Sequence, residues 1–446
     1  MGKQQVAMNT EEFLKQELNR RQFLGSSARN AAGMAAGMVG LSAVDAAAAA
    51  GDPVSVGVVG VRSRGRELAS ELAAMPQARV RALCDVDQSV LSSAARELQD
   101  LQGTAPRQFH DFRQLLDDPA IGAVVIATPD HWHAPMTIMA CQAGKHVYVE
   151  APLSHSLTES RDVLQAAEQS GKTVVCGLQQ RSGSHFQAAV DVVRSGTIGR
   201  VSLARAWAMH RRKPLPPATE TASAPEGVDY NLWLGPAPAR AFNRNRFHQH
   251  WRWFPEYGSG ELGQWGVHML DLARWGLGAG WPQRVSASSG RRVLKDARET
   301  PDTLQARFEY DHCTILWEQA QWSHHGLEGR SAGVAFYGEN GTLIVDRGGW
   351  KVYDIRDTLA GASSPQTGPH LAQFLSAIQQ GSAPAGLPGL EEARISTDLC
   401  HLADISTRLQ RDIRFDPAAG TFPTDAAARK LMARATRSDW QSADFA

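Results

Sequence analysis

The sequence lacks a net charge, long apolar runs and paired cysteines. Its 446 residues carry 46 Lys and Arg against 46 Asp and Glu. A nucleic-acid-binding protein normally has a basic excess, so the balance argues against nucleic acid as a partner and fits a neutral substrate. Without a long run of large apolar residues, several membrane spans are excluded, and we expect no membrane span. Five cysteines without a CxxC pair make a disulfide framework or structural zinc site unexpected.

The N-terminal segment has the composition of an export signal. Arg20 and Arg21 precede the apolar pair Phe23 and Leu24, and an Ala- and Gly-rich stretch follows at 31–44. This order resembles a twin-arginine signal, with small residues near 46–48 suited to cleavage. We therefore predict a signal peptide at 1–50, handling by the twin-arginine export machinery and a periplasmic or otherwise exported protein. A basic start of a frayed helix is the alternative.

Beyond the leader, the pattern changes once along the chain. Short apolar stretches alternate with helical patterns up to about residue 178, which predicts a parallel sheet covered on both faces. The expected strands are 54–59, 80–84, 123–128, 146–149 and 173–178, and the expected helices are 89–101, 135–144 and 157–171. Later β-rich stretches at 201–209, 304–310, 314–322 and 341–346 predict an antiparallel sheet, and a helical pattern returns from 370.

A glycine-containing turn follows the first expected strand. Residues 60–65 fit GxGxxG except that Arg62 replaces the middle glycine. Such a turn presents backbone N–H groups and a helix N-terminus to a pyrophosphate. The nucleotide-binding candidates here are Gly60, Arg62, Ser63, Arg64 and Gly65. Arg62 either turns outward or supplies charge to the phosphates, and a merely structural turn is the other interpretation.

An acidic residue ends the second expected strand. Asp85 lies about twenty residues after the glycine turn, where a carboxylate accepts hydrogen bonds from adenosine ribose hydroxyls. This favours NAD over NADP, whose 2′-phosphate a carboxylate repels. Asp87 is the alternative carboxylate, and both residues are also suited to capping the next helix. Arg62 keeps NADP possible.

Three further polar clusters follow expected parallel strands. Because the carboxyl ends of such strands form the ligand crevice, the clusters at 128–133, 150–152 and 179–181 should face one cleft. We assign the cofactor candidates Thr128, Pro129, His131, His133 and Glu150, and the substrate candidates Gln179 and Arg181. Each cluster alone is equally compatible with turn formation.

A segment of the second half, 258–271, places Gln264, His268 and Asp271 at helical spacing. Positions i, i+4 and i+7 share one helix face, so the three side chains should lie together. Three histidine pairs could each suggest a metal site, but none has an acidic or third histidine ligand at diagnostic spacing, so we expect no metal. These pairs are His131/His133, His248/His250 and His324/His325.

Together, these features resemble the Gfo/Idh/MocA family, named for glucose-fructose oxidoreductase and inositol dehydrogenase, over about residues 53–410. The resemblance rests on 54–65, 84–87, 127–134, 144–147, 150–152, 258–271 and 338–346. It implies an α/β fold, with an N-terminal Rossmann doubly wound parallel sheet (51–180) binding NAD(P). A C-terminal α+β domain with an open, mainly antiparallel sheet (181–369) would follow, then C-terminal helices and a tail (370–446). A sugar or polyol would bind between the domains, and the open sheet often forms a homo-oligomer.

The resemblance also shows two departures. Family members typically carry a lysine where this chain has Ala151, and often an Asp where it has Gln264. Loss of one acid or base typically costs about 10²–10⁴-fold in rate. The resemblance therefore leaves His268 as the acid/base, with Glu150 and Gln264 as the other catalytic candidates. It also makes His268 and Asp271 candidates for contact with the substrate.

Three functions follow from these residues. The first is an exported NAD(P)-dependent oxidoreductase acting on a sugar, polyol or glycoside with a tightly held, internally recycled cofactor. The second is a redox-neutral, NAD-dependent glycoside hydrolase resembling glycoside hydrolase family 109, which oxidises and eliminates before returning the hydride. The third is a non-catalytic nucleotide- or sugar-binding homologue that has lost its base.

Overall fold

The computed structural model describes residues 52–216, 223–356, 358–382, 384, 386–437 and 440. The predicted signal peptide lies outside these residues. The chain from Asp52 onward forms one compact unit that contains both predicted sheets. Within the described residues, no helix has the length and apolar character needed to cross a membrane.

The first sheet has six parallel strands in the order β3-β2-β1-β4-β5-β6. The strands are β1 (Val54–Val59), β2 (Ala78–Cys84), β3 (Arg107–Phe109), β4 (Ala123–Ile126), β5 (His146–Val149) and β6 (Val174–Cys176). The predicted parallel sheet is confirmed.

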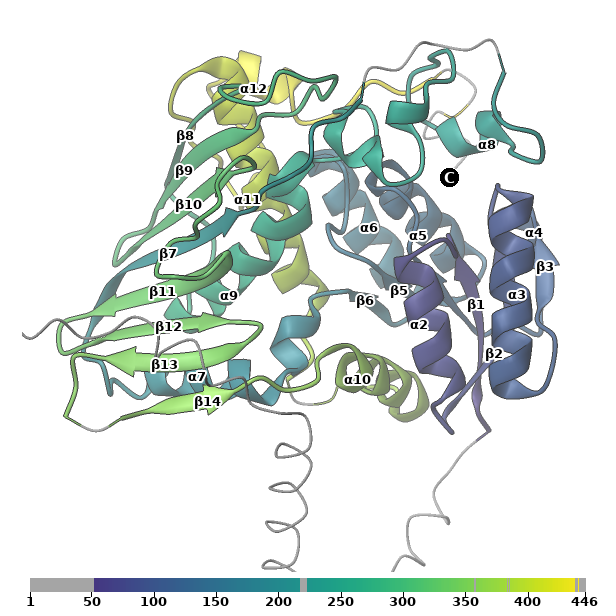
Figure 1. Ribbon diagram of the computed structural model, residues 1–446, viewed down its shortest axis with the longest axis horizontal. Coiled ribbons are helices and arrows are strands. Elements are labelled where there is room, and N and C mark those ends of the chain that lie inside the picture. Colours follow the sequence, from purple (N-terminus) through teal and green to yellow (C-terminus); the bar gives the residue numbers. More distant parts are fainter. Residues whose placement is uncertain are drawn as a thin grey trace, which may run out of the picture. The chain divides into compact units, whose positions relative to one another are not determined.

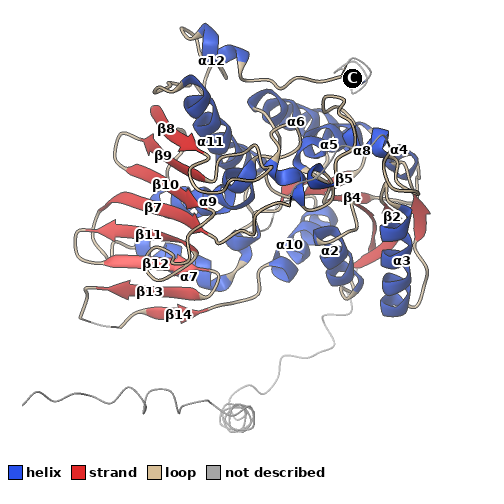
Figure 2. Cartoon of the chain, turned by 45° about the horizontal axis from the view of Figure 1, so that its top comes forward, coloured by secondary structure: helices blue, strands red, loops and turns tan. Residues whose placement is uncertain are grey.

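Helices cover both faces of this sheet (Figures 1 and 2). They are α2 (Arg64–Ala73), α3 (Gln88–Gln102), α4 (Phe112–Leu116), α5 (His133–Gln142) and α6 (Leu157–Ser170). A helix from much later in the chain, α10 (Thr367–Gln380), joins them, because Leu371 and Phe374 share a buried cluster with Val56 and Leu68. Burying both faces requires strands without polar alternation, as the sequence indicated.

The second sheet has eight strands in the order β14-β13-β12-β11-β7-β10-β9-β8. The strands are β7 (Val201–Met209), β8 (Arg284–Gly290), β9 (Thr303–Glu309), β10 (Thr314–Ala320), β11 (Ala332–Gly338), β12 (Thr342–Asp346), β13 (Gly349–Tyr353) and β14 (Ala360–Ala362). Neighbouring strands are antiparallel except β7 and β10. The predicted mainly antiparallel sheet is therefore confirmed.

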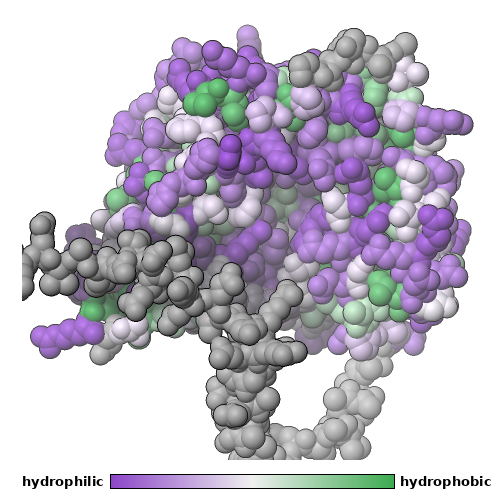
Figure 3. Space-filling view, in the orientation of Figure 1, coloured by the Kyte–Doolittle hydropathy of each residue, from purple (hydrophilic) through white to green (hydrophobic). Residues whose placement is uncertain are grey.

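Helices pack along this larger sheet (Figure 2). They are α7 (Ser184–Arg194), α9 (Val267–Leu277) and α11 (Leu390–Leu409), while α12 (Ala426–Lys430) follows near the chain end. A five-residue π-helix, Leu262–Gly266, leads directly into α9. The face of the molecule in Figure 3 is mainly hydrophilic where it is described.

A separate aromatic segment covers the carboxyl end of the first sheet. It contains the short helix α8 (Tyr230–Leu234) and a buried cluster that includes Trp233, Phe247 and Tyr257. Two backbone hydrogen bonds join it to the segment that leads from β2 into α3, from the N–H of Gln88 to the carbonyl of Gly227 at 2.9 Å and from the N–H of Asp229 to the carbonyl of Val86 at 2.9 Å. We call residues 223–258 the cap, since they close over the place where the sequence predicts the nucleotide.

Candidate active site

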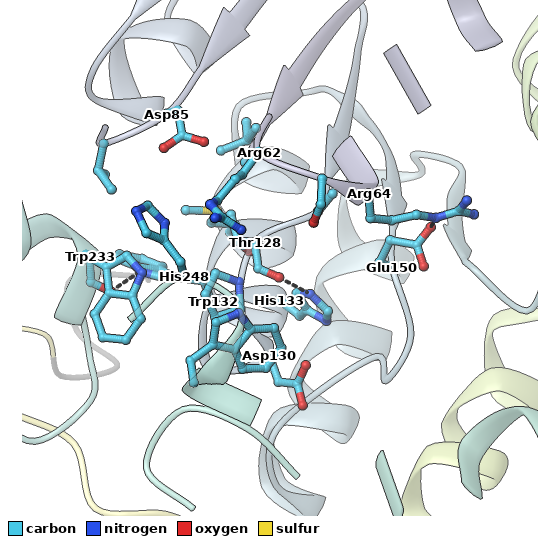
Figure 4. A pocket seen from close by; sticks show the side chains of 18 of the residues that line it. Arg62, Arg64, Asp85, Thr128, Asp130, Trp132, His133, Glu150, Trp233 and His248 are labelled. Carbon is cyan, nitrogen blue, oxygen red and sulfur yellow. Dashed lines mark hydrogen bonds and ion pairs between the residues drawn. The ribbon is translucent and has the colours of Figure 1, made fainter. Parts of the chain in front are cut away.

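The cap and the carboxyl ends of β1, β2, β4 and β5 enclose a long cavity, here called the nucleotide cavity (Figure 4). Asp85 and His248 lie at one end and the Arg64–Glu150 pair at the other. From the predicted set, the cavity lining includes Gly60, Arg62, Ser63, Arg64, Asp85, Thr128, Pro129, His133, Glu150 and Gln264. Residues from the predicted clusters at 128–133 and 150–152 thus line one cavity with the glycine turn, whereas no residue of the cluster at 179–181 lines it.

The glycine turn is shaped for close backbone approach. Gly60 has a φ of 83°, and a Cβ there would lie 2.8 Å from the carbonyl oxygen of Ala127. A Cβ on Gly65 would lie 2.0 Å from the Gly60 carbonyl oxygen, so helix α2 can meet the strand only through glycine. Arg62 replaces the middle glycine without a left-handed backbone and is exposed. The first turn of α2 has no side-chain capping bond from its described N-cap residue, Ser63, which suits a bound pyrophosphate.

Asp85 occupies the position expected for ribose recognition. Its carboxylate accepts hydrogen bonds from the backbone N–H groups of Val61 at 2.9 Å and Asp87 at 3.0 Å. Burial raises its pKa to about 6, and these two hydrogen bonds oppose the rise. The Asp87 side chain instead caps helix α3 and faces His248 at 3.3 Å. Of the two candidate carboxylates, Asp85 therefore remains the one directed at the nucleotide cavity.

The 128–133 cluster divides between the cavity and the cap. The buried hydroxyl of Thr128 has no hydrogen-bond partner among the described residues, as expected for a group reserved for a ligand. His131 is fully buried outside the cavity lining, with Nε2 3.0 Å from the Trp233 carbonyl oxygen. Burial lowers its pKa to about 3, so it is neutral. In this structure, His131 joins the sheet to the cap. The glycine turn at 60–65, the Asp85 carboxylate and the Thr128 hydroxyl, which has no partner among the described residues, together fit a dinucleotide.

A second cavity adjoins the first, and we call it the substrate cavity. Arg64, Glu150, Ala151 and Gln264 line both cavities, so these residues mark the junction. Arg64 donates from Nε to Glu150 at 2.8 Å and also pairs with Glu67 at 2.6 Å. Ala151, the expected lysine position, opens to the junction without a polar group.

The π-helix determines where Gln264 points. The side-chain amide of Gln264 donates to the Asp130 carboxylate at 3.1 Å, and Asp130 also accepts from the backbone N–H of Ser259 at 3.1 Å. Burial raises the pKa of Asp130. Although the family acid is absent at 264, a carboxylate from the first sheet thus lies behind the glutamine. π-Helical turns occur frequently at functional sites.

His268 faces the substrate cavity from the first turn of α9. Its Nδ1 is buried without a hydrogen-bond partner in the described part of the chain. Burial, followed by the nearby positive charge of Arg347, lowers its pKa to about 3. The imidazole is therefore neutral and able to accept a hydrogen bond.

Two predicted substrate residues bind each other instead of facing a cavity. Arg181 forms a bidentate ion pair with Asp271, at 2.8 Å from Nε and 2.7 Å from the terminal nitrogen. Ser396 completes the contact by donating to Asp271 at 2.8 Å. Neither member of the pair lines the described nucleotide or substrate cavity. Gln179 does line the substrate cavity, and its Oε1 is buried without a partner among described residues.

Sequence reasoning missed several residues of these cavities. Trp233, His248 and Arg252 reach the nucleotide cavity from the cap, and Arg347 reaches the substrate cavity from a distant strand turn. The pair His248/His250 was visible in the sequence, but only as a possible metal pattern. No local spacing connects Arg347 to the strand-end clusters.

The chain matches two models of one oxidoreductase family. Residues 54–178 match its NAD-binding Rossmann fold, and residues 213–442 match its C-terminal alpha/beta domain. Among curated proteins, a glycosyl hydrolase family 109 protein of Shewanella pealeana is 29% identical over 212 residues, 44% of this chain and 46% of that protein. The uncharacterized oxidoreductase YrbE of Bacillus subtilis is 31% identical over 164 residues, 37% of this chain and 46% of that protein. The match thus spans less than half of these relatives.

Solved structures share the fold at low identity. Levoglucosan dehydrogenase in complex with NADH and levoglucosan aligns with a TM-score of 0.64 and 19% identity, covering 81% of this chain and 99% of that one. Aldose-aldose oxidoreductase from Caulobacter crescentus aligns with a TM-score of 0.64 and 17% identity, covering 81% and 100%. At such identities the likeness establishes the fold alone.

Proposed function

Because the chain belongs to the Gfo/Idh/MocA oxidoreductase family, we propose that it oxidises or reduces a hydroxyl-bearing carbon of a sugar, polyol or glycoside. The observation that carries the proposal is the junction of the two cavities at Arg64, Glu150, Ala151 and Gln264. A nicotinamide cofactor bound in the first cavity would reach a substrate in the second only there.

The residues that line the two cavities have separate roles in the proposed reaction. A bound nicotinamide supplies the hydride acceptor or donor, so the protein has to move the hydroxyl proton. His268 is placed to take that proton, since it is neutral and its Nδ1 is unpartnered among the described residues. Glu150 holds Arg64 at the junction, and Gln179 offers an oxygen to a substrate hydroxyl.

We further propose NAD as the cofactor, because the Asp85 carboxylate would repel a 2′-phosphate. The exposed guanidinium of Arg62 keeps NADP as the alternative. The hydrogen bonds between the cap and the segment that follows β2 support a tightly held cofactor, which is recycled between a donor and an acceptor sugar. Export by the twin-arginine route and homo-oligomer formation also belong to this proposal.

Native mass spectrometry of the exported protein tests the proposal. We expect a mass increase equal to one NAD per chain, and release of that nucleotide on denaturation. Incubating this holoprotein with a panel of sugars should then change its nicotinamide absorbance. Protein that carries no nucleotide after export, and does not take up NAD or NADP when supplied, contradicts the proposal.

The glycoside hydrolase alternative is favoured by the relatives named glycosyl hydrolase family 109. In that reaction, the sugar is oxidised, loses its aglycone by elimination, adds water and regains its hydride, so the net change is hydrolysis. Aryl glycosides distinguish the two. Release of the phenol without accumulation of NADH supports hydrolysis, whereas sugar-dependent NADH accumulation supports the dehydrogenase.

Ala151 favours the third, non-catalytic interpretation, because it cannot accept a proton. The variant Ala151→Lys tests this directly. Sugar oxidation that appears only in this variant would show that the native chain has lost dehydrogenase chemistry. Equal activity in both proteins would show that the native site already has a working base.

A further inference from the structure

Arg347 is a cation of the substrate cavity that forms no direct ion pair with a carboxylate among the described residues. Arg347 lies in the turn between β12 and β13 and lines the cavity together with His268 and Gln264. Its guanidinium carbon is 4.6 Å from the centre of the Trp265 ring. This stacking fixes one face of the group against an aromatic side chain and directs the arginine toward the cavity.

The neighbouring carboxylates are engaged elsewhere. Asp346, next to Arg347 in sequence, pairs with Arg330 at 2.7 Å. Glu150 and Glu67 both pair with Arg64. Within the described chain, no carboxylate lies at ion-pair distance from Arg347.

The surroundings of Arg347 disfavour its positive charge, although the cavity lining also holds Glu67 and Glu150. Desolvation and the nearby Arg64 guanidinium lower the pKa of Arg347, and the attraction of Glu150 and Glu67 only partly opposes this shift. Arg347 as a whole residue is exposed. Because Glu150 and Glu67 are already paired with Arg64, an anion beside Arg347 would supply the direct partner that this guanidinium lacks among the described residues.

The same cavity offers groups suited to hydroxyls. His268 Nδ1 and Gln179 Oε1 are both buried there without partners among the described residues. Unpaired buried polar atoms of this kind are costly unless a ligand or water satisfies them. We propose that the substrate is a sugar derivative with one anionic group, a carboxylate or sulfate, which binds Arg347. This inference rests on the proposed function, and it replaces the neutral substrate that the level charge count suggested.

Binding to the nucleotide-loaded protein tests the proposal. Calorimetry would compare hexoses with the matching hexuronates and hexose 6-sulfates in the gluco, galacto and manno series. A hydrogen bond to a charged group contributes about 1.5–3 kcal/mol, which corresponds to about 10–100-fold in affinity. In at least one series we expect the anionic sugar to bind at least about tenfold more tightly than the neutral one.

Two variants locate the effect. Arg347→Gln should abolish the preference for the anionic sugar while leaving the affinity for the neutral one within about twofold. Arg356→Gln removes the same charge from an exposed arginine outside both cavity linings and should preserve the preference. The melting temperatures of both variants check folding. A preference absent from every series, or one that persists in Arg347→Gln, overturns the proposal.

The binding measurement separates this inference from the proposed function. If anionic sugars bind through Arg347 but are never oxidised or cleaved, the specificity holds and the enzymatic proposal fails. If neutral sugars are turned over and Arg347→Gln has no effect, the enzymatic proposal holds and the specificity fails. The uronate and sulfate arms identify which anion the site accepts.

Discussion

Replacing Asp271 by Asn tests whether the buried pair with Arg181 stabilises the fold or binds substrate. The Asp271 side chain is only 2% exposed and that of Arg181 9%, and two short hydrogen bonds join them. The amide keeps the shape of the carboxylate but removes its charge. Arg181 then retains only Glu392, at 3.5 Å and 46% exposed, as a described carboxylate partner.

The expected loss of stability is large for a single substitution. Breaking a buried ion pair by removing one charge typically costs about 3–5 kcal/mol, because the other charge stays buried without compensation. For a unit of this length, unfolding near about 60 °C has an entropy of roughly 0.8 kcal/mol/K. The melting temperature should therefore fall by roughly 4–6 °C.

Differential scanning calorimetry measures this shift, with Glu339→Gln as the matched control. Glu339 forms an ion pair with Arg200 at 3.0 Å, but the two side chains are 57% and 77% exposed, so its loss should be nearly silent. Nucleotide and sugar binding by Asp271→Asn should stay unchanged below the transition. An unaltered melting temperature combined with lost sugar binding would refute the reasoning and return both residues to the substrate site.

Three further predictions concern the two cavities. NADH affinity, followed by fluorescence, should fall as the pH drops through about 6, since protonation removes the Asp85 charge, and Asp85→Asn should flatten this profile. Gly65→Ala should abolish nucleotide retention in native mass spectra, because the new Cβ would lie 2.0 Å from the Gly60 carbonyl oxygen. The control Gly280→Ala should retain the nucleotide, because a Cβ there has nothing within 4 Å. His268→Asn should lower turnover by about 10²–10⁴-fold while the protein retains its nucleotide. The control His324→Asn changes an exposed histidine and should leave turnover and nucleotide retention unchanged. Equal turnover in the two variants would show that His268 is not the acid/base.

The sequence predicted the presence of the long apolar strands better than their ends. The bounds of β1, β5 and β7 agree with the prediction to the residue. The fully buried strands β4 and β6 each end two residues earlier than predicted, because a continuous apolar run does not show where strand pairing stops. Strand β3 was not predicted, since it has three residues and two of them are exposed. No apolar run marks a strand of that kind, and its pairing with β2 determines it.

The site could be predicted only where local rules apply. Residues at the ends of parallel strands converge because of sheet geometry, which the alternating pattern already contains. The cap follows instead from tertiary pairing, as in the bridge between Asp87 and Val228, which are far apart in sequence. Regular helical spacing also fails at the π-helix, so Gln264 faces Asp130 while Asp271 binds Arg181.

The absence of a lysine at position 151 and the low pKa of His268 both bear on which group accepts the substrate's hydroxyl proton. Arg64 already brings positive charge to the junction beside Ala151, but an arginine stays protonated and cannot act as a base. In the proposed reaction, proton transfer falls to His268, whose pKa of about 3 is too low for an efficient base near neutrality. Burial and Arg347 cause that low value, and an anionic substrate offsets the second cause. A sugar acid bound at Arg347 would thus raise the basicity of His268 at the moment when the base is needed, whereas a neutral sugar would leave it weak.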